Sequence, residues 1–301
     1  MKISGFTFVK NAIKLYYPIV EAITSILPLC DEVIVACGDS EDGTTDLVRS
    51  IGDDRIRIIE TVWDPKYFVR GAINAQQSNV ALDECTGDWC LYVQADEVVH
   101  EQDLPGLREK MAHNLGDPEV EGLLFDYKHF YGDYDHYQIG RNWYRHEVRI
   151  VRNGIGAQSW ESAQSFRRDG KKLRVVRADA DIYHYGWVRP PKAMTRKQIA
   201  MATIHKNAEW IEGHYPDQTA EYDFGKLKSR VRFTGTHPDV MKERIAAMNW
   251  KVAPSSSSLQ RHDRLSNRVL SFVESKLLGI RLGEFKNYVL LDRKESEKVR
   301  K

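Results

Sequence analysis

Three polar side chains close together stand at the end of an apolar stretch near residue 90. Residues 89–94 have the composition of a short β-strand. This stretch ends in Gln94, and Asp96 and Glu97 follow it after a single alanine. Polar groups at the carboxyl end of a strand are where open α/β sheets bind ligands. One or two carboxylates, together with substrate phosphates, form a typical site for a hard divalent cation. The pattern predicts metal binding, and a strand that only meets a polar turn is the alternative.

A second polar segment follows another apolar stretch further upstream. Residues 31–37 are rich in β-branched side chains, and residues 38–45 then combine Gly with Asp, Ser and Thr, which bond their own backbone in turns. Apolar residues at helix spacing follow over 47–51. The unit is therefore strand, polar loop and helix. It contains neither a Walker sequence nor G-x-G-x-x-G, which excludes the two commonest phosphate-binding loops.

Alternating strand and helix patterns extend through the first 115 residues and predict a mostly parallel sheet. The strands expected there are 2–9, 32–37, 56–60 and 89–94, and the helices are 12–27, 43–51, 70–85 and 103–114. Further strands are expected at 121–127, 147–152, 173–176 and 180–187, and helices at 192–215 and 238–250. The fold class is therefore α/β, with a helical C-terminal region.

Together these segments resemble the family 2 glycosyltransferases of the GT-A fold. The loop from Gly38 to Thr44 is similar to the family's Asp-x-Ser-x-Asp-Gly-Thr run, and Gln94-Ala95-Asp96 is similar to its Asp-x-Asp motif. The opening stretch from Phe6 to Asn11 and the helical stretch from Gln77 to Leu82 look like two further family segments. All four matches occur in the family's order.

The resemblance implies a GT-A-like fold, with a mostly parallel central sheet flanked by helices. Residues 1–191 would form the catalytic domain, with a nucleotide-binding half at about 1–115 and an acceptor half at about 116–191. Residues 192–301 would form a basic helical region. The implied activity is inverting transfer of a sugar from a nucleotide-diphosphate sugar to a hydroxyl of a glycan or lipid-linked acceptor, as in the synthesis of bacterial-type surface polysaccharides.

The resemblance also implies which residues bind the donor and the metal. The residues expected to contact the nucleotide sugar are Phe8, Asn11, Asp39, Asp42, Gln77, Asn79 and Gln94. A divalent metal, Mn²⁺ or Mg²⁺, would be bound by Asp96, with Glu97 and the late histidine His184 as further ligands. Such a metal neutralises the diphosphate as its bond to the sugar breaks.

The chain departs from the family pattern at three positions that are usually acidic, which are Gly38, Gln94 and Gln164. The last of these matters most, because an inverting enzyme needs a carboxylate to take the proton of the acceptor hydroxyl. Glu161 is the only acid between residues 158 and 164, so Glu161 and Asp96 are the expected catalytic residues. The alternative bases are Asp133, Asp135 and Glu147.

These missing acids leave a second function open, from a different class. A noncatalytic module that binds a sugar nucleotide or a glycan on the same scaffold would not need an acid at any of the three positions. Turnover, with and without manganese, is the observation that separates the two functions.

The amino-acid composition indicates the cellular compartment in which we expect the protein. The 301-residue chain has no run near the ~18 apolar residues of a membrane helix, and its first residues lack the apolar core of a signal peptide. None of the four cysteines forms a C-x-x-C pair, which favours buried, reduced thiols over a zinc site. We therefore expect a cytoplasmic protein.

Charge is divided unequally along the chain. Residues 193–301 contain 21 Lys and Arg against 13 Asp and Glu, whereas residues 1–192 contain 23 against 30. The basic part includes an amphipathic segment, 264–281, which predicts peripheral contact with the inner face of a membrane, or packing against the catalytic domain or a second subunit as a homodimer. No nucleic-acid-binding motif accompanies the charge, so nucleic acid is not an expected partner.

Overall fold

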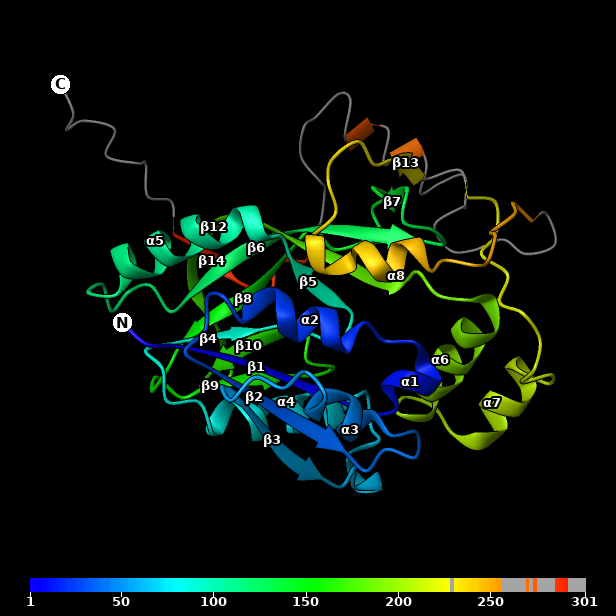
Figure 1. Ribbon diagram of the computed structural model, residues 1–301, viewed down its shortest axis with the longest axis horizontal. Helices are drawn as coiled ribbons and strands as arrows, with labels where there is room; N and C mark the ends of the chain where they lie inside the picture. Colours follow the sequence, from blue (N-terminus) through cyan, green and yellow to red (C-terminus); the bar gives the residue numbers. More distant parts are fainter. Residues whose placement is uncertain (228–229, 256–268, 271–272, 275–284, 292–301) are drawn as a thin grey trace.

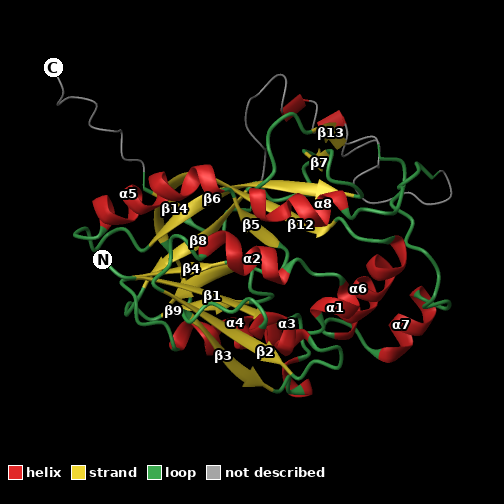
Figure 2. Ribbon diagram, in the orientation of Figure 1, coloured by secondary structure: helices red, strands yellow, loops and turns green. Residues whose placement is uncertain are grey.

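The computed structural model describes residues 1–227, 230–255, 269–270, 273–274 and 285–291. Within this part of the chain, one 11-stranded sheet forms the centre of the molecule. Its main path runs β13 (Arg230–Arg232), β7 (His136–Gln138), β6 (Gly122–Tyr131), β8 (His146–Arg152), β4 (Trp89–Tyr92), β1 (Ile3–Val9), β2 (Glu32–Gly38) and β3 (Ile56–Thr61). Beside that path, β12 (Arg174–Trp187) pairs with β6, β5 (Glu97–Val99) and β14 (Val289–Leu290). Figures 1 and 2 show the helices arranged around this sheet.

The first half of the sheet is parallel, as expected. β1 (Ile3–Val9) lies between β2 (Glu32–Gly38) and β4 (Trp89–Tyr92), and β3 (Ile56–Thr61) pairs with β2 at the edge. Because these strands share one direction, their carboxyl ends meet at a single edge of the sheet. The loops that follow β1 and β4 therefore lie close together.

Five helices accompany this half of the described chain. They are α1 (Ala12–Leu15), α2 (Ile19–Ile26), α3 (Thr44–Arg49), α4 (Ala72–Asp83) and α5 (Leu104–Asn114), with short 3-10 turns η1 (Pro65–Tyr67) and η2 (Glu101–Asp103). The single helix expected at 12–27 is interrupted, because Tyr16 adopts a left-handed conformation with φ of 59° and Pro18 has no N–H to continue the helix.

The second half of the sheet is mixed. β8 (His146–Arg152) is antiparallel to both β4 and β6 (Gly122–Tyr131). One long strand, β12 (Arg174–Trp187), replaces the two strands expected at 173–176 and 180–187, and a register shift after Arg177 separates its halves. The remaining strands here are β5 (Glu97–Val99) and β7 (His136–Gln138), and a small separate sheet consists of β9 (Ala157–Trp160), β10 (Ser165–Arg168) and β11 (Lys171–Lys172).

Alternate side chains of the central strands fill a hydrophobic layer on each face of the sheet. Leu91 and Val93 join the layer that includes the apolar residues of α2 and α5, whereas Cys90 and Tyr92 join the layer that includes those of α4. The stretch therefore has the side-chain period of two that is general for β-strands. This period continues past the end of β4 and sets the side of the sheet from which the following polar residues project.

The chain after residue 191 is not a purely helical region. It contains α6 (Pro191–Thr203), α7 (Ala208–His214), η3 (Asp239–Met241) and α8 (Lys242–Ala246), but β13 (Arg230–Arg232) and β14 (Val289–Leu290) join the main sheet. Short edge strands of this kind gain their hydrogen bonds from a neighbouring strand, so their sequence carries little signal. Most of the amphipathic segment 264–281 lies outside the described residues.

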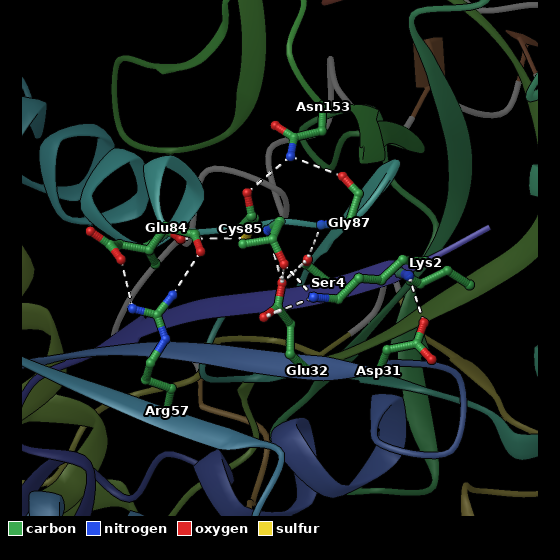
Figure 3. Close-up of polar contacts among 12 residues, drawn as sticks. Lys2, Ser4, Asp31, Glu32, Arg57, Glu84, Cys85, Gly87 and Asn153 are labelled. Carbon is green, nitrogen blue, oxygen red and sulfur yellow. Dashed lines mark hydrogen bonds and ion pairs between the residues drawn. The ribbon is translucent and has the colours of Figure 1, made fainter.

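A polar network joins the amino-terminal ends of the parallel strands (Figure 3). Glu32 accepts hydrogen bonds from the hydroxyl of Ser4 at 2.5 Å and from the backbone N–H of Thr86 at 2.8 Å. Asn153 donates to the carbonyls of Cys85 and Gly87, both at 2.9 Å. The network stabilises the sheet at the end opposite the carboxyl edge, where ligands bind in open α/β sheets.

Composition also predicted that the chain has no membrane helix and that its cysteines are buried and reduced. None of their helices has the length and apolar character needed to cross a membrane. All four cysteines are buried and free, as expected for reduced thiols.

Candidate functional site

A pocket of about 950 Å³ opens at the edge where β1 and β4 end. Its wall combines Phe8 and Asn11 at the end of β1, Asp96 after β4, His184 on β12 and Lys197 on α6. Segments from distant parts of the chain therefore meet around one cavity. Both its place at the carboxyl edge and its volume are those of a small-molecule site in an α/β protein.

Asp96 is a buried carboxylate between two cations. The residue is 5% exposed, and its Oδ2 accepts a hydrogen bond from Lys197 Nζ at 3.0 Å and lies 3.6 Å from Arg189 Nη2. Burial alone would raise the pKa of Asp96, but the positive charges around it, led by Lys197, hold the pKa well below its ordinary value. Asp96 is therefore ionised at neutral pH.

His184 lies near the other oxygen of Asp96, with its Nε2 3.8 Å from Oδ1. Its Nδ1 is 3.0 Å from Nδ1 of His129, whose Nε2 is 2.7 Å from the carbonyl oxygen of Tyr144. Because a carbonyl can only accept, we assign the proton of His129 to Nε2, and His129 Nδ1 then accepts from His184 Nδ1–H. This chain of bonds leaves a lone pair on His184 Nε2, beside Asp96. Burial lowers the pKa of His184 to about 4, which keeps its ring neutral.

Asp96 and His184 together fit a divalent cation. A histidine that ligates a metal characteristically has its other ring nitrogen hydrogen-bonded, as His184 does to His129. Within the described residues, no group of three or more His, Cys, Asp or Glu side chains is arranged to hold a metal. A cation bound by this pair would therefore complete its shell with substrate oxygens and water.

Glu97, expected as a third ligand, has structural partners instead. It is completely buried, and its carboxylate pairs with Arg149 through bonds of 2.8 and 2.9 Å. The hydroxyl of Tyr127 donates to the same carboxylate at 2.8 Å. Because both oxygens are bonded to buried neighbours, we leave Glu97 out of the proposed ligand set.

Glu161 lies in the turn between β9 and β10 and lines the same pocket. The turn is strained, since the non-glycine residues Glu161 and Ala163 have φ angles of 50° and 56°. Gln94 Nε2 donates to the Ala163 carbonyl at 3.0 Å, and Arg149 Nη1 donates to the Gln164 carbonyl at 2.8 Å. Backbone strain persists where surrounding contacts enforce it, and it is common at functional sites.

Asp96 and Glu161 are the only carboxylates on the pocket wall among the described residues. The alternative bases lie elsewhere. Asp133 pairs with His136 and Arg230, both at 2.8 Å, and buried Glu147 accepts a hydrogen bond from Asn287 at 3.0 Å. Asp135 does not line the pocket either. Of the four candidate bases, the structure brings Glu161 alone to the cavity.

Three of the residues expected to bind the nucleotide sugar line the pocket, namely Phe8, Asn11 and Gln94. The other four, Asp39, Asp42, Gln77 and Asn79, lie outside its wall. Asp39 accepts a hydrogen bond at 2.7 Å from Lys10, which does line the pocket, so Asp39 is connected to the pocket only through Lys10. Asp42, Gln77 and Asn79 bond to Thr44, Thr61 and Ser159, and these bonds tie loops and strands together.

Gly38 stands where the family usually has an acid, and the structure supplies a steric reason. A Cβ at this position would be 2.4 Å from Nε1 of Trp63, which is closer than atoms can approach. Trp63 lines the pocket. The indole therefore occupies the space that a longer side chain at position 38 would need.

Sequence reasoning missed Lys197, Arg189 and His129. Lys197 carried a signal, because it falls within the apolar stripe of α6, three residues after Met194 and four before Met201. A lysine at such a position is unusual unless it has a buried partner. Arg189 and His129 are also buried, but nothing in their sequence surroundings marks them.

Comparison with known proteins adds a family assignment. The model of glycosyl transferase family 2 matches residues 9–180. Among solved structures, the chain is similar to TarS of S. aureus, with 18% identity over 67% of this chain and 39% of TarS, and a TM-score of 0.40. It is also similar to glucosyl-3-phosphoglycerate synthase from Mycobacterium tuberculosis in complex with Mn²⁺, UDP and phosphoglyceric acid, with 22% identity over 43% of each chain and a TM-score of 0.29.

A third similar structure is the mannosyltransferase PcManGT from Pyrobaculum calidifontis in complex with GDP-Man and Mn²⁺, with 22% identity over 43% of this chain and 35% of that chain, and a TM-score of 0.31. This chain spans less than half the length of each of these three. No curated protein matches it. The family match covers more than half of the chain and confirms the resemblance drawn from its motifs: the chain belongs to glycosyl transferase family 2.

Proposed function

We propose that this protein is an inverting glycosyltransferase that moves a sugar from a nucleotide-diphosphate sugar to a hydroxyl of a glycan or lipid-linked acceptor. The observation that supports this most is the contrast between the two carboxylates of the pocket. Asp96 is buried beside cations that keep it ionised, which suits a carboxylate that would hold a divalent metal at the donor's diphosphate. Glu161 is exposed in the pocket, which suits a group that takes a proton from an acceptor.

In this proposal Glu161 accepts the proton of the acceptor hydroxyl as the hydroxyl oxygen attacks the anomeric carbon of the sugar. The bond between that carbon and the diphosphate oxygen breaks, and its electron pair stays with the diphosphate. Attack from the face opposite the leaving group inverts the configuration. The bonds from Gln94 and Arg149 to the strained turn hold Glu161 in position for this attack.

Asp96 and His184 would hold the divalent metal, Mn²⁺ or Mg²⁺, and the metal would supply positive charge that stabilises the departing diphosphate. The chain's contribution is to orient the two residues that would bind the metal, Asp96 and His184. His129 holds His184 in the tautomer that presents a lone pair. Lys197 and Arg189 keep Asp96 ionised.

The acceptor would bind at the aromatic part of the pocket. Trp143, Trp187 and Tyr222 lie on the wall there and pack against one another or their neighbours. Aromatic faces suit the apolar faces of sugar rings, and nearby polar groups can bond the hydroxyls. This composition supports a glycan, free or lipid-linked, as the acceptor.

The test is release of nucleoside diphosphate from a panel of nucleotide sugars in the presence and absence of Mn²⁺. Thermal shift first identifies the donor, since a ligand that binds only the folded state raises its apparent stability. Turnover that depends on Glu161 supports the proposal. Saturable binding of a nucleotide sugar without turnover, over a broad set of glycan acceptors, would instead favour the noncatalytic module.

The proposed location at the inner face of a membrane rests on segment 264–281. Its basic, amphipathic sequence supports either peripheral membrane contact or contact with a second copy of the chain. Sedimentation with vesicles distinguishes membrane contact from contact with a second copy. Salt-sensitive binding to anionic but not neutral vesicles supports the membrane role, whereas a dimer in solution without vesicle binding supports the other.

A further inference from the structure

Lys197 is a buried lysine whose ammonium reaches the pocket from the side of α6. The residue is only 8% exposed, yet it lines the cavity. Nζ donates to Asp96 Oδ2 at 3.0 Å and to the carbonyl of Gly186 at 2.7 Å. An ammonium has three N–H donors, so these two bonds leave one.

The two oxygens of Asp96 face two different places. Oδ1 lies on the side of His184, and Oδ2 lies on the side of Lys197. Lys197 therefore already occupies the cation position next to Oδ2. Oδ1 is the Asp96 oxygen that would remain for a divalent metal held with His184, so lysine and metal would share this carboxylate.

Positive charge exceeds negative charge around this carboxylate in the described structure. Lys197 and Arg189 both lie within 4 Å of Asp96, and Arg149 nearby is paired with Glu97. Arg189 is fully buried, donates from Nη1 to the carbonyl of Leu15 at 2.6 Å and lies over the Tyr17 ring. The single carboxylate of Asp96 therefore faces two buried cations, and buried positive charge that is not fully compensated is costly. An anion in the pocket would lower that cost, and a diphosphate has the right charge.

We propose that Lys197 binds the diphosphate of the donor, with its third N–H directed to a diphosphate oxygen, and that it shares with the metal the neutralisation of the leaving group. When the bond from the anomeric carbon to the diphosphate oxygen breaks, the electron pair remains on that oxygen and the ammonium stabilises it without transferring a proton. This inference rests on the proposed function, because it names a further substrate-binding residue of the same site.

The ammonium of Lys197 is present with or without the metal, so its effect on nucleotide binding can be measured after the metal is removed. The nucleoside diphosphate keeps part of its affinity when the metal is removed, because Lys197 still provides a cation. Isothermal titration calorimetry of the full chain with UDP and with GDP, in Mn²⁺ and in EDTA, measures this directly. We expect weaker but measurable binding in EDTA.

Lys197→Met removes the charge at similar length, and should weaken binding in EDTA by about 10–100-fold, as expected for loss of a charged hydrogen bond. Lys197→Gln removes the charge but keeps donors for Asp96 and Gly186, so it decides the question if the Met variant does not fold. Lys192→Met is the matched control, since Lys192 is exposed on the same helix and does not line the pocket.

Each outcome has a defined meaning. Selective loss of binding in EDTA by a folded Lys197 variant, with Lys192→Met unchanged, supports the proposal. Equal binding in EDTA by wild type and the neutral Lys197 variants overturns it, as does wild-type binding that vanishes in EDTA. Absence of nucleotide and nucleotide-sugar binding in both Mn²⁺ and EDTA would instead overturn the proposed function itself.

Discussion

The side-chain amide of Gln94 donates a hydrogen bond to the backbone carbonyl of Ala163 at 3.0 Å. This bond connects the loop that contains Asp96 to the strained turn that contains Glu161. An ionised carboxylate at position 94, as in the Asp-x-Asp motif, could not donate this hydrogen bond. The amide therefore links the loop of Asp96, the proposed metal ligand, to the proposed base.

Gln94→Glu tests this link, because it preserves size but places a carboxylate against the Ala163 carbonyl. We expect kcat to fall about tenfold, the equivalent of roughly one hydrogen bond, because the turn loses its anchor and Glu161 shifts. The KM for the donor should change less. Steady-state kinetics would show the opposite split, a raised donor KM with kcat intact, if Gln94 contacts the nucleotide sugar, as its motif position suggests.

Glu161→Gln keeps the shape of the side chain and removes its basicity. We expect kcat to fall on the order of 10²–10⁴-fold if Glu161 is the base. The melting temperature should be unchanged, because the side chain is exposed. Glu147→Gln is the matched control, since Glu147 is an acid of the same sheet region that does not line the pocket. Turnover near wild type in Glu161→Gln would exclude Glu161 as the base.

Asp96→Asn should abolish turnover and also destabilise the protein. Removal of the carboxylate leaves Lys197 and Arg189 buried without their common partner, which typically costs about 3 kcal/mol or more of unfolding free energy. Urea unfolding measures the loss of stability. Titration with Mn²⁺ measures whether turnover is lost because the metal no longer binds. A variant with wild-type stability and intact Mn²⁺ binding would contradict both roles of Asp96.

His129→Phe keeps a buried ring but removes the acceptor for His184 Nδ1–H. His184 can then change tautomer or turn away, so Mn²⁺ affinity should fall about 10–100-fold, as is usual when the partner of a metal-ligating histidine is lost. Titration of Mn²⁺ in the presence of UDP, followed by electron paramagnetic resonance, measures this. Binding of UDP in EDTA serves as the control and should be nearly unchanged.

Glu147 predicts a specific dependence of stability on pH. Burial raises the pKa of Glu147 to about 7 from an ordinary value of 4.5, with Arg149 opposing the shift. Between these values the unfolded chain releases the proton while the folded protein keeps it, so the folded state loses relative stability as pH rises from about 4.5 to 7. Thermal melts at pH 5 and pH 8 should show Glu147→Gln gaining stability relative to wild type at the higher pH, by up to about 3 kcal/mol. An unchanged difference between the two proteins at both pH values would contradict the raised pKa.

The sequence was sufficient to predict the parallel half of the sheet and the edge at which the pocket with the candidate site opens. The continuous apolar run of 89–93 and the turn chemistry of 38–45 are local properties, and local patterns specify strands and their ends. The predictions were wrong where the local pattern is interrupted or too short. The helix expected at 12–27 is divided at Pro18, and β13 and β14 are too short to have a pattern of their own.

What the sequence by itself determined was therefore the α/β class, the family motifs and the place of Asp96 at the end of a central strand. Only the tertiary structure decided which polar side chains meet there. Lys197 contacts Asp96 although 101 residues separate them, and Glu97, the neighbour of Asp96, is taken up by Arg149. Side-chain partners across such distances depend on how α6 and β8 pack against the sheet, and neither composition nor spacing records that packing.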